Sequence, residues 1–197
     1  MFKIELRKIY LAEQKSLSKT ERIEKSRQIA KKFFANFDLR QVNFLHCFLP
    51  IEKFNEIDTK PIFQKVGRDF SHITTLAPRI NFQTGEIESA VFITATALVK
   101  NVWQIDEPTH NKLVETELID LVLVPLLCFD TRGFRVGYGK GFYDKFLSKC
   151  RRNCLKIGLS YFAPATEISD IDEFDIKLDF CITPKKIFSF FAETRAK

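Results

Sequence analysis

The sequence predicts a single-domain α/β fold with a mainly parallel central sheet flanked by helices. Its 197 residues lie within the usual size of one domain and can bury a sizeable core. Apolar, β-branched runs alternate with segments of helical periodicity, which is typical of crossover units between parallel strands. Residues 121–124 form an uninterrupted branched run before Pro125, as expected for a central strand covered on both faces. We therefore expect residues 1–197 to form one domain around one sheet.

Two helices are expected in the first forty residues. Lys3 and Arg7 lie four residues apart and share one face of the first helix. Ser18 and Glu21 form a capping box that begins the second helix, which we expect to end near residues 36–38. Apolar residues at helical spacing mark the buried faces: Phe2, Leu6, Ile9 and Tyr10 in the first helix, and Ile23, Ala30, Phe33, Phe34 and Phe37 in the second.

Shorter elements follow. Pro50 ends a buried strand expected over residues 42–49, and Thr59 after the loop 51–58 is a candidate helix cap. Strands are expected around residues 73–76 and 91–94, with a turn-bearing excursion at 81–88 that contains Gly85. Beyond the central strand and a loop, a helix is expected from about Tyr138 or Lys140 to Cys150. The remaining strands are expected at residues 155–159, 180–183 and 187–191.

Composition excludes several classes of protein. No apolar run approaches the roughly 20 residues of a membrane span, and the N-terminus lacks the apolar block of a signal peptide, so a cytoplasmic location is expected. The five cysteines are odd in number and contain no CxxC pair, which favours reduced thiols. They are Cys47, Cys128, Cys150, Cys154 and Cys181.

The net charge of +6 is concentrated at one end of the chain. Residues 1–40 hold 11 Lys and Arg against 5 Asp and Glu, and the remaining residues are balanced. Such a basic arm could bind nucleic acid or a small anionic ligand, or it could be a solvated helix face. Composition alone leaves these alternatives open.

Glycines cluster where a strand gives way to a helix. Four of the seven glycines are Gly133, Gly137, Gly139 and Gly141, and they are interleaved with Arg132, Arg135, Tyr138 and Lys140. Glycines let backbone N–H groups converge on a phosphate, and cations add charge-assisted contacts. The pattern is neither a P-loop nor a Rossmann fingerprint. Residues 132–144 therefore predict a different nucleotide-phosphate loop rather than a merely flexible turn.

The run VPLLCFDTRGFRVGYGKGFYDKFL at residues 124–147 closely resembles the signature of the 5-formyltetrahydrofolate cyclo-ligase family. Four other pieces follow the family's order: KIELR at residues 3–7, NEIDT at 55–59, WQIDEP at 103–108 and DIKLD at 175–179. The resemblance implies an ATP- and Mg²⁺-dependent closure of 5-formyltetrahydrofolate to 5,10-methenyltetrahydrofolate, with release of ADP and phosphate. It also implies a fold similar to the sugar-phosphate isomerase and CoA-transferase group.

The resemblance assigns residues to each part of the reaction. ATP would be bound by Lys3, Arg7, Arg135, Gly137, Tyr138, Gly139, Lys140, Gly141, Phe142 and Tyr143, of which Lys140, Arg135 and Tyr143 are expected to be catalytic. The folate would contact Ile51, Glu56, Trp103, Tyr138 and Phe142, and Asp144 and Asp179 would ligate Mg²⁺. Trp103 could instead be a core residue, and either aspartate an exposed or capping carboxylate.

The implied chemistry needs no nucleophilic side chain, because the formyl oxygen attacks the γ-phosphoryl group and N10 then displaces phosphate. This agrees with His46, His72 and His110, which show no triad or metal spacing. The sequence departs from the family pattern at Tyr138, Phe142 and Phe174, where relatives carry Arg, Tyr and His.

Two other classes of function remain as alternatives. An isomerase or CoA-transferase relative needs a carboxylate base or nucleophile, for which Glu56 is the candidate. An RNA-binding module led by the basic arm lacks aromatic recognition motifs and leaves the glycines unexplained. We expect small-molecule ligands, no nucleic acid or membrane partner, and a monomer or weak homodimer.

Overall fold

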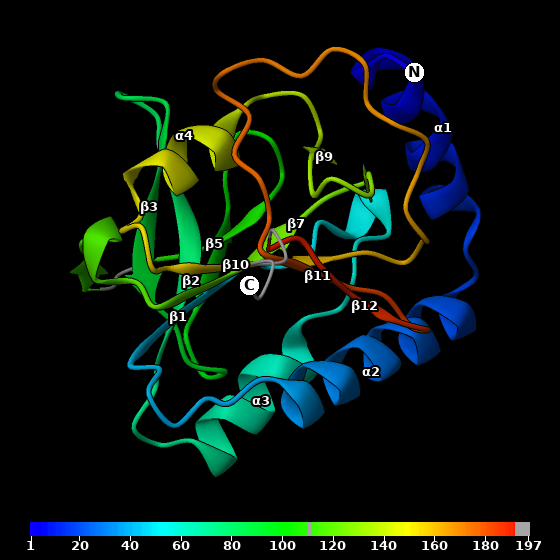
Figure 1. Ribbon diagram of the computed structural model, residues 1–197. Coiled ribbons are helices and arrows are strands. Elements are labelled where there is room, and N and C mark those ends of the chain that lie inside the picture. Colours follow the sequence, from blue (N-terminus) through cyan, green and yellow to red (C-terminus); the bar gives the residue numbers. More distant parts are fainter. Residues whose placement is uncertain (110–111, 192–197) are drawn as a thin grey trace, which may run out of the picture.

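A computed structural model describes residues 1–109 and 112–191, whose elements pack around one eight-stranded sheet (Figure 1). The helical elements are α1 (Lys3–Ser16), α2 (Lys19–Asn36), η1 (Glu52–Phe54), α3 (Lys60–Asp69), η2 (Thr116–Leu118) and α4 (Phe142–Lys149). The strands of the large sheet are β1 (Phe44–Cys47), β2 (Thr74–Asn81), β3 (Glu86–Val91), β6 (Leu113–Val114), β7 (Leu121–Pro125), β10 (Leu155–Leu159), β11 (Phe180–Ile182) and β12 (Ile187–Ser189). Two small antiparallel pairs are β4 (Leu98–Lys100) with β5 (Asp106–Pro108), and β8 (Cys128–Phe129) with β9 (Arg135–Val136).

The sheet has the order β12-β11-β10-β7-β1-β2-β3-β6. Its five central strands, from β11 to β2, run parallel, and β12, β3 and β6 add antiparallel edges. The predicted α/β class with a mainly parallel sheet is therefore confirmed. Because β7 pairs with β1 and β10, it is central, as its branched run predicts.

Two hydrophobic layers cover the sheet. Leu121 and Leu123 of β7 face the core under α2 and α3, whereas Val122 and Val124 face the core under α4. All four side chains are at most 1% exposed, which follows from the alternation of side chains along a strand. In Figure 1, α2 and α3 lie together on one side of the sheet and α4 lies on the other. The α1 helix instead rests on the β8–β9 pair through Leu6.

Two apolar stripes are narrower than predicted. Ser18 caps α2, and its capping box with Glu21 forms as expected. Phe2, Ile9 and Ile23, however, are exposed, and each was wrongly predicted to be buried. The reason in α1 is that the helix rests on a small cluster around Leu6, against which Tyr10 also packs, and this contact leaves Phe2 and Ile9 in solvent.

The middle of the chain also differs from the prediction. Residues 74–91 form a long antiparallel hairpin whose turn at residues 82–85 falls within the expected turn-bearing excursion at 81–88. Because β3 ends at Val91, the strand expected around residues 91–94 is wrong. Gly85 takes the left-handed conformation in its turn (φ 68°). Pro78 lies in β2 beyond the residues that pair with β1, where its missing N–H breaks no ladder on that side. Thr59 precedes α3 as predicted, but its hydroxyl donates to the Phe48 carbonyl rather than capping the helix.

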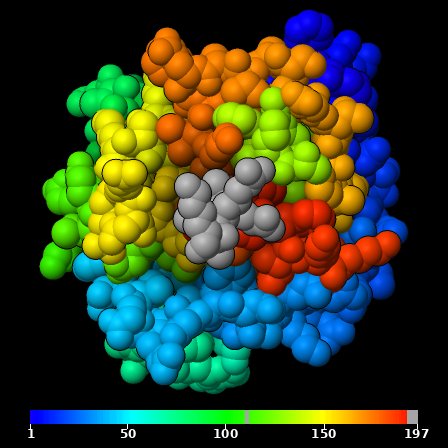
Figure 2. All heavy atoms as spheres, in the orientation of Figure 1, coloured from blue at the N-terminus to red at the C-terminus, as the bar shows by residue number. Residues whose placement is uncertain are grey.

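The last elements match the prediction with shorter bounds. The α4 helix begins at Phe142 rather than at Tyr138 or Lys140, because Gly139 and Gly141 both have positive φ and cannot continue a helix. All five cysteines are free, and four of them are buried. None of the helices in the described part of the chain is both long and apolar enough to cross a bilayer. Figure 2 shows the segment before β11, in orange, spanning the surface from α4 to α1.

Candidate active site

A cavity of about 910 Å³ opens at the carboxyl edge of the parallel sheet. Phe48 and Leu49 follow β1 and Pro125 ends β7, so the two central strands supply its floor. Ligands of open α/β sheets bind at this edge. Apart from Asp179, the cavity gathers all the predicted site residues: Lys3, Arg7, Ile51, Glu56, Trp103, Asp144 and the loop from Arg135 to Tyr143.

The glycine-rich loop forms one wall and is fastened to α1. The Arg7 Nε atom donates to the Gly137 carbonyl oxygen at 3.1 Å. At Gly139 the backbone has φ of 95°, and an added Cβ would lie 3.0 Å from Arg7 Nε. The loop therefore needs glycine at position 139 both for its conformation and for the approach of the arginine. Arg7 and the glycine-rich loop, both assigned to ATP by the resemblance, therefore meet in the structure.

Replacing Gly139 with alanine is expected to weaken binding of an ATP analogue about tenfold, because left-handed backbone strain of roughly 1–2 kcal/mol is added to the contact with Arg7. Titration calorimetry measures this change. Gly67→Ala is the matched control, since Gly67 lies inside α3 and a Cβ added there would meet no atom within 4 Å. Unchanged affinity in the Gly139 variant would show that the loop does not contact the nucleotide.

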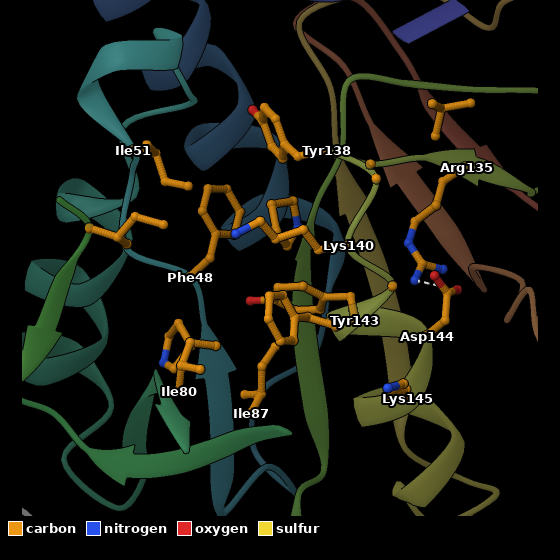
Figure 3. A pocket seen from close by; sticks show the side chains of 18 of the residues that line it. Phe48, Ile51, Ile80, Ile87, Arg135, Tyr138, Lys140, Tyr143, Asp144 and Lys145 are labelled. Atoms are coloured by element: carbon orange, nitrogen blue, oxygen red, sulfur yellow. Dashed lines mark hydrogen bonds and ion pairs between the residues drawn. The ribbon is translucent and has the colours of Figure 1, made fainter. Parts of the chain in front are cut away.

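The cations of the cavity differ in how they are neutralised. Lys3 pairs with Asp175 and lies 3.6 Å from an Asp172 oxygen. The buried Arg135 guanidinium pairs with Asp144 at 2.8 Å and also donates to the Ile176 carbonyl. Lys140 forms no ion pair within the described chain; its Nζ atom lies 3.3 Å from the centre of the Trp103 ring. Figure 3 shows Lys140 extending from the loop between Tyr138 and Tyr143, and the Arg135–Asp144 pair on a separate wall.

The two predicted metal-binding aspartates do not meet. Asp144 lines the cavity, and its Oδ1 atom accepts from Arg135 and from the Ile176 N–H. Asp179 directly precedes β11 and accepts from the Lys156 backbone N–H at 2.7 Å. Because β11 runs parallel to β7, the start of β11 lies at the opposite edge of the sheet from the cavity. The structure therefore contradicts a shared site for Asp144 and Asp179, and Asp179 instead hydrogen-bonds to the backbone of Lys156 in β10.

Glu56 is a buried carboxylate at the apolar end of the cavity. It is 6% exposed, and its Oε2 atom accepts from the Ile51 N–H at 2.7 Å. Burial raises the pKa of Glu56 to about 7, although the hydrogen bond from the Ile51 N–H and the nearby Tyr138 hydroxyl oppose the rise. Ile51 and Glu56, which were predicted to act together, are therefore directly bonded.

Trp103 lines the cavity and belongs to no buried core cluster of the described chain, so the core alternative is wrong. The Asn101 side-chain oxygen accepts from the N–H groups of Trp103 and Ile105 and thereby shapes the turn that presents the indole. Phe142 lies 5.7 Å from the Trp103 ring, centre to centre. The pair forms a wall suited to a flat heterocycle.

Other polar residues have simpler roles. His46 is fully buried with Nδ1 2.9 Å from the Ser89 hydroxyl, and burial lowers its pKa to about 3. His72 lies beside the Leu39 carbonyl, and His110 lies outside the described residues. The Tyr143 hydroxyl is buried with no hydrogen-bond partner in the described chain. These contacts give neither His46 nor His72 a catalytic partner.

Sequence reasoning missed two cavity-forming contacts. Gln14 is buried in α1 and bonds both to the loop before Glu56 and to Tyr138. Its position seven residues after Arg7, on the same helix face as Lys3, was a signal that could have identified it. Asp175 lies in the DIKLD segment, but only the structure reveals that it pairs with Lys3.

Comparisons with known proteins point to one family. The family model described as "5-formyltetrahydrofolate cyclo-ligase family" matches residues 2–184. A 5-formyltetrahydrofolate cyclo-ligase of Mycoplasma genitalium is 29% identical over 90% of this chain and 94% of its own length. Among solved structures, the 5,10-methenyltetrahydrofolate synthetase of Aquifex aeolicus superposes with a TM-score of 0.79 at 26% identity, covering 100% of this chain and 97% of the other. A 5,10-methenyltetrahydrofolate synthetase from Mycoplasma pneumoniae gives 0.74 at 26% identity, covering 93% and 99%.

Proposed function

Because the chain belongs to the 5-formyltetrahydrofolate cyclo-ligase family, we propose that its large cavity is where ATP drives the ring closure. The enzyme converts 5-formyltetrahydrofolate to 5,10-methenyltetrahydrofolate at the expense of ATP. One observation carries the assignment of the site. The glycine-rich loop with its cations and the Ile51–Glu56 loop line the same cavity, so a triphosphate and a pterin can lie side by side.

The reaction proceeds in two steps, and in both the attacking group belongs to the folate rather than to the protein. The formyl oxygen attacks the γ-phosphorus of ATP, ADP leaves, and the formyl carbon becomes an activated iminium phosphate. N10 then attacks this carbon, loses its proton, and the C–O bond breaks to release inorganic phosphate. The residues of the cavity need to position the two reactants and to neutralise phosphate charge.

The phosphate end of the cavity is assigned to the loop and α1. Gly137, Gly139, Lys140 and Gly141 all line the cavity, and their backbone N–H groups and the Lys140 ammonium would bind the phosphates. Arg7 fixes the loop through the Gly137 carbonyl. Arg135 acts on the phosphates only indirectly, because its guanidinium pairs with Asp144 and holds that carboxylate in place.

Mg²⁺ fits this end of the cavity through one carboxylate rather than two. Asp144 keeps its Oδ2 atom without a hydrogen bond from any described residue, and the described residues contain no cluster of three metal-ligating side chains. Mg²⁺ commonly binds through one or two carboxylates, substrate phosphates and water, so Asp144 together with ATP is a sufficient set. Bound there, the ion would neutralise charge on the phosphates.

The folate end is assigned to the aromatic and acidic residues. Trp103 and Phe142 would contact the flat pterin, and the Glu56 carboxylate would accept from its N–H groups. The walls between them are apolar and include Phe48, Ile80 and Ile87 (Figure 3). Cytoplasmic location, the absence of nucleic-acid and membrane partners, and a monomeric or weakly dimeric state remain part of this proposal.

Incubation of the purified 197-residue chain with MgATP and 5-formyltetrahydrofolate tests the function. We expect methenyltetrahydrofolate to form, with one phosphate released for each product molecule. Omission of ATP should abolish product formation. Ring closure at an equal rate without ATP would contradict the mechanism, and an isomerase activity that depends on Glu56 would favour the alternative.

A further inference from the structure

Gln14 joins the two loops to which the two substrates are assigned. Its side chain is 3% exposed, and its single amide nitrogen donates to the Phe54 carbonyl at 2.8 Å and to the Tyr138 hydroxyl at 2.9 Å. Phe54 belongs to the segment between Ile51 and Glu56, and Tyr138 belongs to the glycine-rich loop. One buried amide therefore uses both of its N–H groups to connect segments more than eighty residues apart in sequence.

Three further contacts secure the same junction. The rings of Phe54 and Tyr138 stack with centres 4.9 Å apart and planes 16° apart. The Asn55 amide donates to the Lys15 carbonyl at 3.0 Å and approaches the Gln14 carbonyl at 3.4 Å. Movement of either loop alone would leave one N–H of the buried Gln14 amide without a hydrogen-bond acceptor. Such a movement is unfavourable, because buried polar groups are costly to leave unpaired.

The junction also reaches the groups assigned to each ligand. Arg7, on the same helix as Gln14, donates to Gly137 next to Tyr138. On the other side, the nearby Tyr138 hydroxyl helps to lower the pKa of the Glu56 carboxyl against the effect of burial. A continuous path thus runs from the phosphate loop through Tyr138 and Gln14 to the carboxylate of the folate end.

We propose that Gln14 is a positioning residue that couples the binding of ATP to the binding of the reduced folate. This inference rests on the proposed function. A nucleotide that orders the glycine-rich loop fixes Tyr138, and Tyr138 with Gln14 then fixes the loop that carries Ile51 and Glu56. Each substrate therefore binds more tightly when the other is present. The first ligand to bind has already ordered the shared junction, so the second ligand binds with a smaller loss of conformational entropy.

Titration calorimetry measures this coupling as the ratio of folate affinities with and without a saturating, non-hydrolysable ATP analogue and Mg²⁺. For the unmodified protein we expect a ratio of about 5- to 150-fold, the usual range of such couplings. Gln14→Leu should bring the ratio close to one. Tyr138→Phe removes only the hydroxyl and keeps the ring stack, and it should have the same effect. In the double variant the loss should be no greater than in either single variant.

Gln28→Leu on α2 is the matched control, because Gln28 bonds only to Glu24 among described residues and does not line the cavity. Its ratio should equal that of the unmodified protein. If Gln14→Leu fails to fold, judged by thermal unfolding, Tyr138→Phe decides the question alone. A ratio near one in the unmodified protein, or a full ratio in Tyr138→Phe, would overturn the coupling while leaving the proposed function standing. Failure of the unmodified protein to bind either ligand would overturn both.

Discussion

Replacing Lys140 with alanine is expected to lower kcat by about 100- to 1,000-fold, the range seen when one charge-stabilising group is removed from a transition state. Lys140 has no carboxylate partner in the described chain, whereas the neighbouring Lys3 and Arg135 are paired with Asp175 and Asp144. Its ammonium group, which lies over the Trp103 ring, therefore has no carboxylate partner among the described residues to leave before it neutralises charge that builds up on the transferring phosphoryl group. Steady-state phosphate release with saturating substrates measures the loss.

Lys149→Ala is the control for Lys140→Ala. Lys149 lies on α4, pairs with Glu86 at 2.6 Å, and does not line the cavity. Its replacement should leave kcat within a factor of about two, since surface ion pairs contribute little. Equal activity of the two variants would show that Lys140 does not act on the phosphates.

Replacing Glu56 with glutamine is expected to weaken folate binding by about 10- to 100-fold, because a charge-assisted hydrogen bond worth roughly 1.5–3 kcal/mol is lost. The same change should stabilise the free protein at alkaline pH. Burial raises the pKa of Glu56 from 4.5 to about 7, so the folded chain retains a proton that the unfolded chain releases. The resulting cost to stability is absent below pH 4.5, grows between pH 4.5 and about 7, and reaches on the order of 3 kcal/mol above that range.

Urea unfolding at a series of pH values measures the stability effect, and calorimetry measures folate affinity. The free energy of unfolding of Glu56→Gln, relative to the unmodified protein, should rise across that pH window. Glu52→Gln, an exposed change on the same loop, should show neither effect. If the two proteins differed in free energy of unfolding by the same amount at every pH, and folate affinity were unchanged, Glu56 would have no role in the site.

Patterns that are local in sequence predicted the central parts of the molecule. The branched run of β7 fixes its central position, because only a strand covered on both faces needs four consecutive apolar side chains. The clustered glycines and cations predicted a special loop between a strand and a helix, and the four-residue spacing of Lys3 and Arg7 predicted that both lie on one face of their helix. In the structure both residues line the same cavity as the loop.

Features that depend on packing partners could not be read in the same way. Asp175 and Asp179 belong to one short motif, yet Asp175 reaches the cavity and Asp179 directly precedes a strand that starts at the opposite edge of the sheet. The direction of the chain through this motif decides between them, and it is set by the pairing of β11 with β10. Exposure of Ile23 likewise depends on which face of α2 packs on the core, where Ile29 and Phe33 are buried, and helical periodicity alone does not reveal this.

The fate of the formyl oxygen tests most directly whether the cavity brings the γ-phosphoryl group of ATP to the folate. In a reaction with 5-formyltetrahydrofolate whose formyl oxygen carries a heavy isotope, we expect the label to appear in the released inorganic phosphate, because that oxygen bonds to phosphorus before ring closure. Mass spectrometry of the phosphate measures it. Release of unlabelled phosphate, with the label recovered in water, would mean that ATP is hydrolysed without transfer to the folate and would contradict a shared site.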